Sequence, residues 1–403
     1  MTRLLALALA ACLLPAVAPA QVRIEEGVNA QLAAQRLAVA VEGTDPALTE
    51  AVRQALSLHG GFTVSASATA RLQLDRAGNS CRVSCSQAGY AFQTEVSGRD
   101  ANDLALRAAD AAVVGLGRRF NLRPLFADTR VAFLSTYAVG KREILAGNLL
   151  MRGVHQLTRL GCDNLGPRWS ADGTRVAFVS LARNLPDLYV VGYPAGQPRA
   201  LIAGMRGTLT GGAASPDGRR IAFCSSNKGK TLDLYVADAN GGNRRCILQS
   251  EDRVESDAAW SPDGQQIVFA SGVSGSPRLF VIPATGGTAT QLATGGGYAS
   301  EPSWNRVDRN LIAFTQAGEG TNSVAVLDLS RGAVAVAAQG TGGLAHSRAS
   351  WCADGRHVVV QTQQRGTDAY WLSLADTVTG KVTRLTGSQL RSCTQPDCWY
   401  PAR

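Results

Sequence analysis

A motif that recurs about every 45 residues constrains this chain more than any other feature of its sequence. A tryptophan is followed by a Ser-Pro-Asp-Gly turn and then by an alternating apolar segment, as in residues 260–271. The spacings are 45, 46, 44 and 47 residues between the tryptophan positions, which are Trp169, Ala214, Trp260, Trp304 and Trp351. A fixed period of this length indicates repeated units that pack against their neighbours.

Each unit reads as four short antiparallel strands. In the turn, proline presets the first corner and glycine takes the position where a side chain would be strained. A third strand follows about ten residues later, for example at residues 233–236, and a Gly-rich turn leads to the fourth. Four such strands in a repeat of this length are typical of a propeller blade. We interpret the recurring carboxylates as turn residues and the tryptophans as blade core, at Asp172, Asp217, Asp263 and Asp354 and at Trp169, Trp260, Trp304 and Trp351.

The two ends of the repeat region complement each other. Residues 130–135 carry the second half of the motif without a preceding tryptophan, and residues 397–401 carry the first half with nothing after it. We therefore expect the Trp399 strand to complete the blade that begins at Arg130 and to close the ring. Six blades follow from the second half-motifs, which contain Phe133, Phe178, Phe223, Phe269, Phe314 and Val360.

Residues 21–126 lack the repeat and predict a small α/β domain. Asp45-Pro46 marks the start of a helix that runs to Leu58, because Asp is favoured at the cap and Pro at the first position. A second helix is expected at 100–119, and strands at 37–41, 62–64, 70–74 and 90–96. The predicted fold is mainly β: a six-bladed β-propeller over residues 127–403, preceded by this small α/β domain.

The first 20 residues predict export. A positive Met1–Arg3 start, an apolar run and Ala18-Pro19-Ala20 form a secretory signal peptide with cleavage before Gln21. The run is too short to span a membrane, and we expect no transmembrane segment. The alternative is lipidation at Cys12, because Leu9-Ala10-Ala11-Cys12 matches a lipoprotein box.

Eight cysteines would remain after this cleavage, and an even number in an exported chain suggests disulfides. Cys393 and Cys398 are the best local pair, because Gln395-Pro396-Asp397 reads as a turn. Cys81 and Cys85 would be about 13 Å apart in an extended strand, too far to bond, and would pair only if the chain bends there. No C-x-x-C motif occurs and the four histidines are dispersed, so we expect no metal or other cofactor.

The net charge of +9 comes from basic residues spread along the chain, which favours solubility over a nucleic-acid partner. No G-x-S-x-G elbow is present, so the sequence gives no sign of a serine hydrolase. The expected working surface is instead the funnel around the propeller axis. Its polar residues of both charge signs, which suit docking of a protein, are Asn164, Arg168, Thr210, Glu255, Asp257, Ser300, Glu301, His346, Arg348 and Gln395.

The repeated W-S-P-D-G-x-x-I-x-F-x-S motif, the order of signal peptide, α/β domain and six blades, and the segment 127–135 resemble the TolB family of the Tol–Pal envelope system. The resemblance implies a non-enzymatic periplasmic scaffold, a monomer, that binds a peptidoglycan-associated lipoprotein and other Tol-type proteins. It also implies a role in envelope integrity and cell division. This chain departs from the family pattern in three places: its N-terminal part is shorter, Ala214 replaces a tryptophan, and the segment 308–310 replaces the Asp-Gly turn.

Two other functions stay open at this point. Six-bladed propellers host lactonase or glycan-cleaving sites in the same funnel, where Glu255, Asp257 and Glu301 would be the catalytic carboxylates. A lipid-anchored sensor or carbohydrate-binding propeller is the third possibility.

Overall fold

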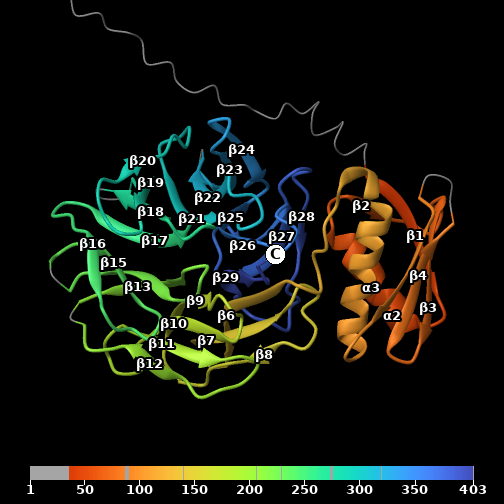
Figure 1. Cartoon of the computed structure of the whole chain (residues 1–403), viewed down its shortest axis with the longest axis horizontal. Helices are drawn as coiled ribbons and strands as arrows, with labels where there is room; N and C mark the ends of the chain where they lie inside the picture. Colours follow the sequence, from red (N-terminus) through yellow and green to blue (C-terminus); the bar gives the residue numbers. More distant parts are fainter. Residues whose placement is uncertain are drawn as a thin grey trace, which may run out of the picture.

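The computed structural model describes residues 36–402, except for 87–89, 139, 206, 228, 273–275 and 319. The predicted signal peptide, the cleavage site before Gln21 and the alternative site at Cys12 lie outside the described residues. Within them, a ring of small sheets stands beside a compact α/β unit (Figure 1). None of the described helices is long and apolar enough to span a membrane.

The α/β unit is built on one five-stranded sheet in the order β2-β1-β3-β4-β5. The strands are β1 (Leu37–Gly43), β2 (Phe62–Val64), β3 (Ala70–Ala77), β4 (Ser80–Cys85) and β5 (Phe92–Ser97). Two helices, α2 (Pro46–Leu58) and α3 (Ala101–Leu116), pack against each other and against this sheet, and the short helix η1 (Arg118–Phe120) follows. The predicted helices and strands are confirmed, but β4 was not predicted.

Both helices begin where an aspartate caps them. The Asp45 carboxylate accepts a hydrogen bond from the Leu48 backbone N–H at 2.9 Å, and Asp100 accepts one from Asp103 at the same distance. Pro46 occupies the first turn of α2, as the sequence predicts. Apolar side chains of α2 then recur on one face and are buried against the sheet.

Six four-stranded blades make up the ring among the described residues, and each is numbered here from its place in the chain. Blade 1 consists of β29 (Thr394–Trp399), β6 (Arg130–Ala138), β7 (Lys141–Asn148) and β8 (His155–Gln156). Blade 2 consists of β9 (Asn164–Trp169), β10 (Arg175–Ser180), β11 (Asp187–Gly192) and β12 (Arg199–Ile202). Blade 3 consists of β13 (Leu209–Ala214), β14 (Arg220–Ser225), β15 (Asp233–Asp238) and β16 (Arg245–Leu248).

The other three blades repeat the same order from the inner to the outer strand. Blade 4 consists of β17 (Val254–Trp260), β18 (Gln266–Gly272), β19 (Arg278–Pro283) and β20 (Thr290–Gln291). Blade 5 consists of β21 (Ala299–Trp304), β22 (Leu311–Ala317), β23 (Asn322–Asp328) and β24 (Ala333–Ala338). Blade 6 consists of β25 (Leu344–Trp351), β26 (His357–Gln364), β27 (Tyr370–Asp376) and β28 (Val382–Arg384). The predicted six-bladed propeller is confirmed.

The ring closes as predicted, with the C-terminal strand β29 pairing with β6. The register differs by one residue from the expected one. Trp169 pairs with Val176 in blade 2, whereas in blade 1 the residue opposite the equivalent Val131 is Cys398. Cys398 therefore takes the tryptophan position of the closing blade, and Trp399 takes the position after it.

The turn and core interpretations hold for most repeats. The tryptophans of the motif are 2–8% exposed. Asp172, Asp217 and Asp263 each accept a hydrogen bond from the serine two residues earlier, at 2.5–2.6 Å, and from the backbone N–H two residues later. Asp354 differs, because Cys352 replaces that serine and the carboxylate bonds His357 instead.

The predicted pairing of Cys393 with Cys398 is wrong in this structure, where none of the eight cysteines of the described residues forms a disulfide. Residues 395–397 are not a turn but part of the extended strand β29, so the strand itself separates the two thiols. The neighbour of the Cys398 thiol is instead Cys352. Cys81 and Cys85 lie buried along β4 and are likewise unpaired, as their spacing predicts.

The α/β unit and the propeller share one hydrophobic core. Apolar side chains of α2 and α3 form a single buried cluster with Phe133 and Leu145 of blade 1 and Leu372 and Leu374 of blade 6. Polar contacts add to it: the Lys381 ammonium donates to the Ser57 carbonyl at 2.6 Å, and Arg152 donates to Gln54 at 3.3 Å. The α/β unit is therefore docked at the seam where the ring closes (Figure 1).

Candidate functional site

A β-bulge interrupts the innermost strand of every blade three residues before the tryptophan position. The ladder between the inner strand and its neighbour shifts register at this place in all six blades. At each bulge one residue has a left-handed backbone, with φ between 52° and 88°: Gly166, Gly211, Asp257, Glu301, Arg348 and Gln395. Bulges re-aim side chains, and here they bring one residue of each blade to the ring centre.

Three of these residues form an ion-pair network on the axis. The Arg348 guanidinium lies 2.9 Å from the Glu301 carboxylate and 3.9 Å from that of Asp257. Glu301 also accepts hydrogen bonds from the Thr315 hydroxyl at 2.6 Å and from the Arg348 backbone N–H at 3.1 Å. Blades 4, 5 and 6 are thus linked through one arginine, whose side chain is about one-third exposed.

The other half of the axis is lined by a second polar group. The Gln395 side-chain oxygen accepts the Gly166 backbone N–H at 2.6 Å, and the Arg168 guanidinium lies 3.4 Å from the Asp397 carboxylate. A cavity of about 30 Å³ remains between these residues and the Glu301–Arg348 pair. The axial site is therefore a narrow, polar opening rather than a deep pocket.

Five predicted funnel residues do not join this axial group. Asn164, Glu255 and His346 are 0–4% exposed and lie at the starts of their inner strands. The Asn164 amide donates to the Arg142 carbonyl at 2.8 Å, and the His346 ring lies 3.1 Å from the Thr362 hydroxyl. Thr210 faces Cys224, and Ser300 is buried beside the Tyr298 hydroxyl. The structure brings together Arg168, Asp257, Glu301, Arg348 and Gln395.

Glu255, in the inner strand β17 of blade 4, is buried. Its carboxylate lies near the hydroxyls of Ser271 and Ser250, and burial raises its pKa. A second opening, of about 100 Å³, lies at the other end of the inner strands and is lined by residues of all six blades, Trp260 and Trp351 among them. The two openings mark the two faces of the ring.

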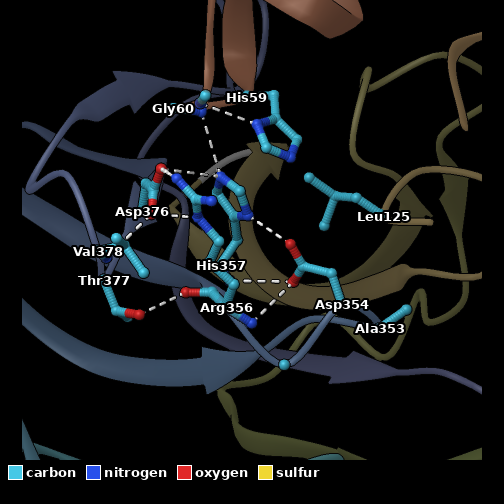
Figure 2. Close-up of polar contacts among 12 residues, drawn as sticks. His59, Gly60, Leu125, Ala353, Asp354, Arg356, His357, Asp376, Thr377 and Val378 are labelled. Atoms are coloured by element: carbon cyan, nitrogen blue, oxygen red, sulfur yellow. Dashed lines mark hydrogen bonds and ion pairs between the residues drawn. The ribbon is translucent and has the colours of Figure 1, made fainter. Parts of the chain in front are cut away.

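A buried polar cluster joins the α/β unit to blade 6 (Figure 2). The His357 ring lies 2.6 Å from the Asp354 carboxylate through Nδ1, and its Nε2 accepts the Gly60 backbone N–H at 3.2 Å. The His59 ring packs edge-on against that of His357, with 4.5 Å between ring centres. On the other side Arg356 donates twice to Asp376, at 2.8 and 2.7 Å.

Candidate metal-ligand atoms of His59, Asp354 and His357 lie within 4.8 Å of one another. The hydrogen bonds oppose a metal there. A backbone N–H points at Nδ1 of His59, from Gly61 at 2.9 Å, and another points at Nε2 of His357. Each neutral ring therefore carries its proton on the nitrogen that faces the cluster. Those nitrogens have no lone pair for a cation, so we assign the cluster to domain docking.

The structure also shows why sequence reasoning missed this cluster. His59 and His357 are 298 positions apart in numbering, and while His59 belongs to no motif, His357 occupies a variable position of the repeat, so only the docking of α2 on blade 6 brings them together. The register of the closing strand could have been predicted from the sequence. Pro396 aligns with Pro167 and Pro302, and this alignment puts Cys398 at the position that Trp169 and Trp304 hold in their repeats.

Comparison with known proteins agrees with this geometry. The model of the TolB β-propeller domain matches residues 126–392, about two thirds of the chain. The chain belongs to the TolB β-propeller family.

Individual members show how far the likeness extends. The Tol-Pal system protein TolB of Desulfosudis oleivorans is 38% identical over 63 residues, which cover 16% of this chain and 14% of that relative. TolB from Acinetobacter baumannii superposes with a TM-score of 0.76 at 19% identity, over 91% of this chain and 97% of that one. A provisionally named TolB from Agrobacterium tumefaciens gives a TM-score of 0.51 at 17% identity, over 64% and 88%. These two superpositions establish a shared fold with TolB structures.

Proposed function

We propose that this protein is a non-enzymatic periplasmic scaffold of a Tol-Pal-type system that supports envelope integrity. We further propose that it binds a peptidoglycan-associated lipoprotein through the axial residues Arg168, Asp257, Glu301 and Arg348. The observation that carries the proposal is the set of bulges. Asp257, Glu301, Arg348 and Gln395 hold left-handed backbones that cost non-glycine residues free energy. Strain repeated at one functional position in four blades supports a role in binding.

The charges of the axial group fit a polar protein partner. Arg348 can exchange its partners Glu301 and Asp257 for groups on an incoming chain, because the three side chains are partly exposed. Arginine is enriched at interface hot spots, and its planar head suits carboxylates. A partner that presents a carboxylate and a hydrogen-bond donor on a narrow projection would match this opening.

An enzymatic function has less support. Glycan hydrolysis uses two carboxylates of different pKa on either side of the bond that is cleaved. Asp257 and Glu301 are both held by Arg348, and Glu255, whose pKa is raised, is buried away from the opening. This arrangement supports binding over acid–base chemistry in the funnel.

The experiment is a calorimetric titration with the soluble domain of a peptidoglycan-associated lipoprotein from the same organism. We expect Arg348→Ala to weaken binding by about tenfold to a hundredfold, as for an interface arginine, while the exposed Arg183→Ala leaves it unchanged. No binding by the unaltered protein would overturn the proposal. Hydrolysis of a lactone or glycan that disappears in the Glu255→Ala, Asp257→Ala, Glu301→Ala triple variant would favour the enzyme instead.

A further inference from the structure

The seam between blades 2 and 3 lacks the tryptophan that fills comparable seams. In three blades the tryptophan of the motif reaches across to the preceding blade and donates its indole N–H to a backbone carbonyl there. These bonds are Trp169 to Asp397 at 3.0 Å, Trp260 to Ala213 at 2.9 Å and Trp351 to Ser303 at 3.0 Å. In blade 3 the same position is Ala214, opposite Ile221 in the ladder.

A cavity of about 400 Å³ lies at this seam. Blade 2 contributes Ala177, Val190 and Leu201 to its wall, and blade 3 contributes Ala214 and Ile221. By strand pairing, these three blade 2 residues are equivalent to Ala222, Val236 and Ile247 of blade 3. At the next seam, between blades 3 and 4, those residues share a core cluster with Trp260. The walls are therefore those that hold an indole elsewhere in this ring.

Blade 2 also has an arginine equivalent to the one that covers the Trp260 indole at the next seam. In the neighbouring seam the Arg220 guanidinium stacks over the Trp260 ring at 4.6 Å and donates to the Gly264 carbonyl at 2.9 Å. The equivalent arginine of blade 2 is Arg175, which lines the cavity. Its side chain is exposed, and its guanidinium makes no hydrogen bond with the described residues. The Trp260 indole donates to the Ala213 carbonyl, and the equivalent carbonyl in blade 2 is that of Arg168.

We propose that this vacancy, the blade 2–3 pocket, binds the tryptophan side chain of a partner polypeptide. The indole enters between Val190 and Ala214, donates its N–H to the Arg168 carbonyl and is covered by Arg175. Apolar cavities of about 150 Å³ already bind an aromatic ring such as benzene, and cation–π contact adds to the burial of the ring. This pocket lies at the seam rather than at the axial opening, so it goes beyond the proposed function.

The test uses the whole protein and N-acetyl-L-tryptophanamide as a probe, followed by nitrogen–proton NMR shifts. We expect saturable binding with a dissociation constant on the order of 1 mM, and none by N-acetyl-L-leucinamide at the same concentration. Arg175→Ala should weaken binding about two- to fivefold, as loss of an exposed cation–π contact predicts. The exposed Arg219→Ala is the matched control and should leave the affinity unchanged.

A second variant separates filling of the pocket from loss of folding. Ala214→Trp restores the residue of the motif, so it should abolish probe binding and raise the melting temperature by about 2–4 °C. The axial variant Arg348→Ala should bind the probe normally, which keeps this test independent of the axial proposal. Equal binding by the leucine amide, or unchanged binding by a folded Ala214→Trp protein, would overturn the proposal. Binding of free L-tryptophan at least tenfold tighter than the blocked amide would assign the pocket to a small molecule and overturn it too.

Discussion

At the scale of single residues, the axis of this ring is built from side chains on strained backbone. Asp257 has φ of 54°, a conformation that costs an ordinary residue about 1–2 kcal/mol and glycine almost nothing. Replacing it with glycine or alanine removes the same carboxylate but only glycine removes the strain. We expect Asp257→Gly to be more stable than Asp257→Ala by about 1 kcal/mol in urea unfolding, with equal loss of partner affinity. Equal stabilities would show that the bulge is relaxed.

A second residue-scale consequence is a dependence of stability on pH. Burial lowers the pKa of His59 well below 6.5. The folded protein therefore keeps this ring neutral, while the unfolded chain takes up a proton below about pH 6.5. The contribution of His59 to stability is complete above that pH and is lost as the pH falls towards the folded-state pKa.

Urea unfolding at pH 7.5, 6.5 and 5.5 measures this effect. The loss attributable to His59 approaches about 1.4 kcal/mol per pH unit below pH 6.5. We expect His59→Phe, which keeps a buried ring, to reduce the slope of stability against pH. His155→Phe, at an exposed position, serves as the control. His346, whose pKa burial also lowers, contributes equally to both proteins and cancels in the difference. An unchanged slope in the His59 variant would contradict the assignment.

At the scale of elements, one carboxylate fixes the connection between α3 and the propeller. Asp110 of α3 accepts the backbone N–H groups of Leu125, Phe126 and Ala127 at 2.7–2.8 Å, the first two bonds buried and the third partly buried. Removing the carboxylate leaves three backbone donors without this partner, and each of the two buried ones costs about 1–3 kcal/mol. At pH 8 we expect Asp110→Ala to lose at least about 3 kcal/mol in chemical unfolding.

The N-cap of the same helix gives a calibrated control. Asp100→Ala removes one backbone hydrogen bond at the exposed start of α3, so it should cost about 1 kcal/mol. A loss of similar size in both variants would mean that water replaces the Asp110 contacts and that the connection is not fixed by this side chain.

The same scale shows what the sequence could and could not predict. The blades, the α2 cap at Asp45 and the closing strand follow from periodicity and turn chemistry, which are local. β4 was missed although Ser80–Cys85 alternates polar residues with the buried Cys81, Val83 and Cys85, because two of these three positions are cysteines rather than the branched or aromatic residues typical of strands. The axial group was only half predicted: loop position suggested ten residues, but the bulges that select Asp257, Glu301, Arg348 and Gln395 depend on strand register. The His59–His357 contact depends on docking and carries no local signal.

At the scale of the whole molecule, closure and docking coincide. The α/β unit packs on blades 1 and 6, the two blades that meet where β29 completes the ring. Gly60 allows the close approach, since a Cβ there would overlap the Asp376 carboxylate. The junction of the two units and the seam of the ring therefore stabilise each other, and a change at one should reach the other.

Shortening the chain so that it ends at Ser392 tests this coupling. The deletion removes β29 together with the buried side chains of Cys398 and Tyr400 and the Asp397 contacts of Trp169. We expect a loss of about 5 kcal/mol or more from the lost burial, and association of molecules through the edge of β6 that β29 otherwise covers. Circular dichroism in urea and light scattering measure both. Removal of Ala402 and Arg403 alone should change neither, and a peptide spanning residues 393–401, added in trans, should restore the monomer. If the shortened protein unfolds at the original urea concentration and stays monomeric, the pairing of β29 with β6 is not needed, and blade packing together with the docked α/β unit holds the ring closed.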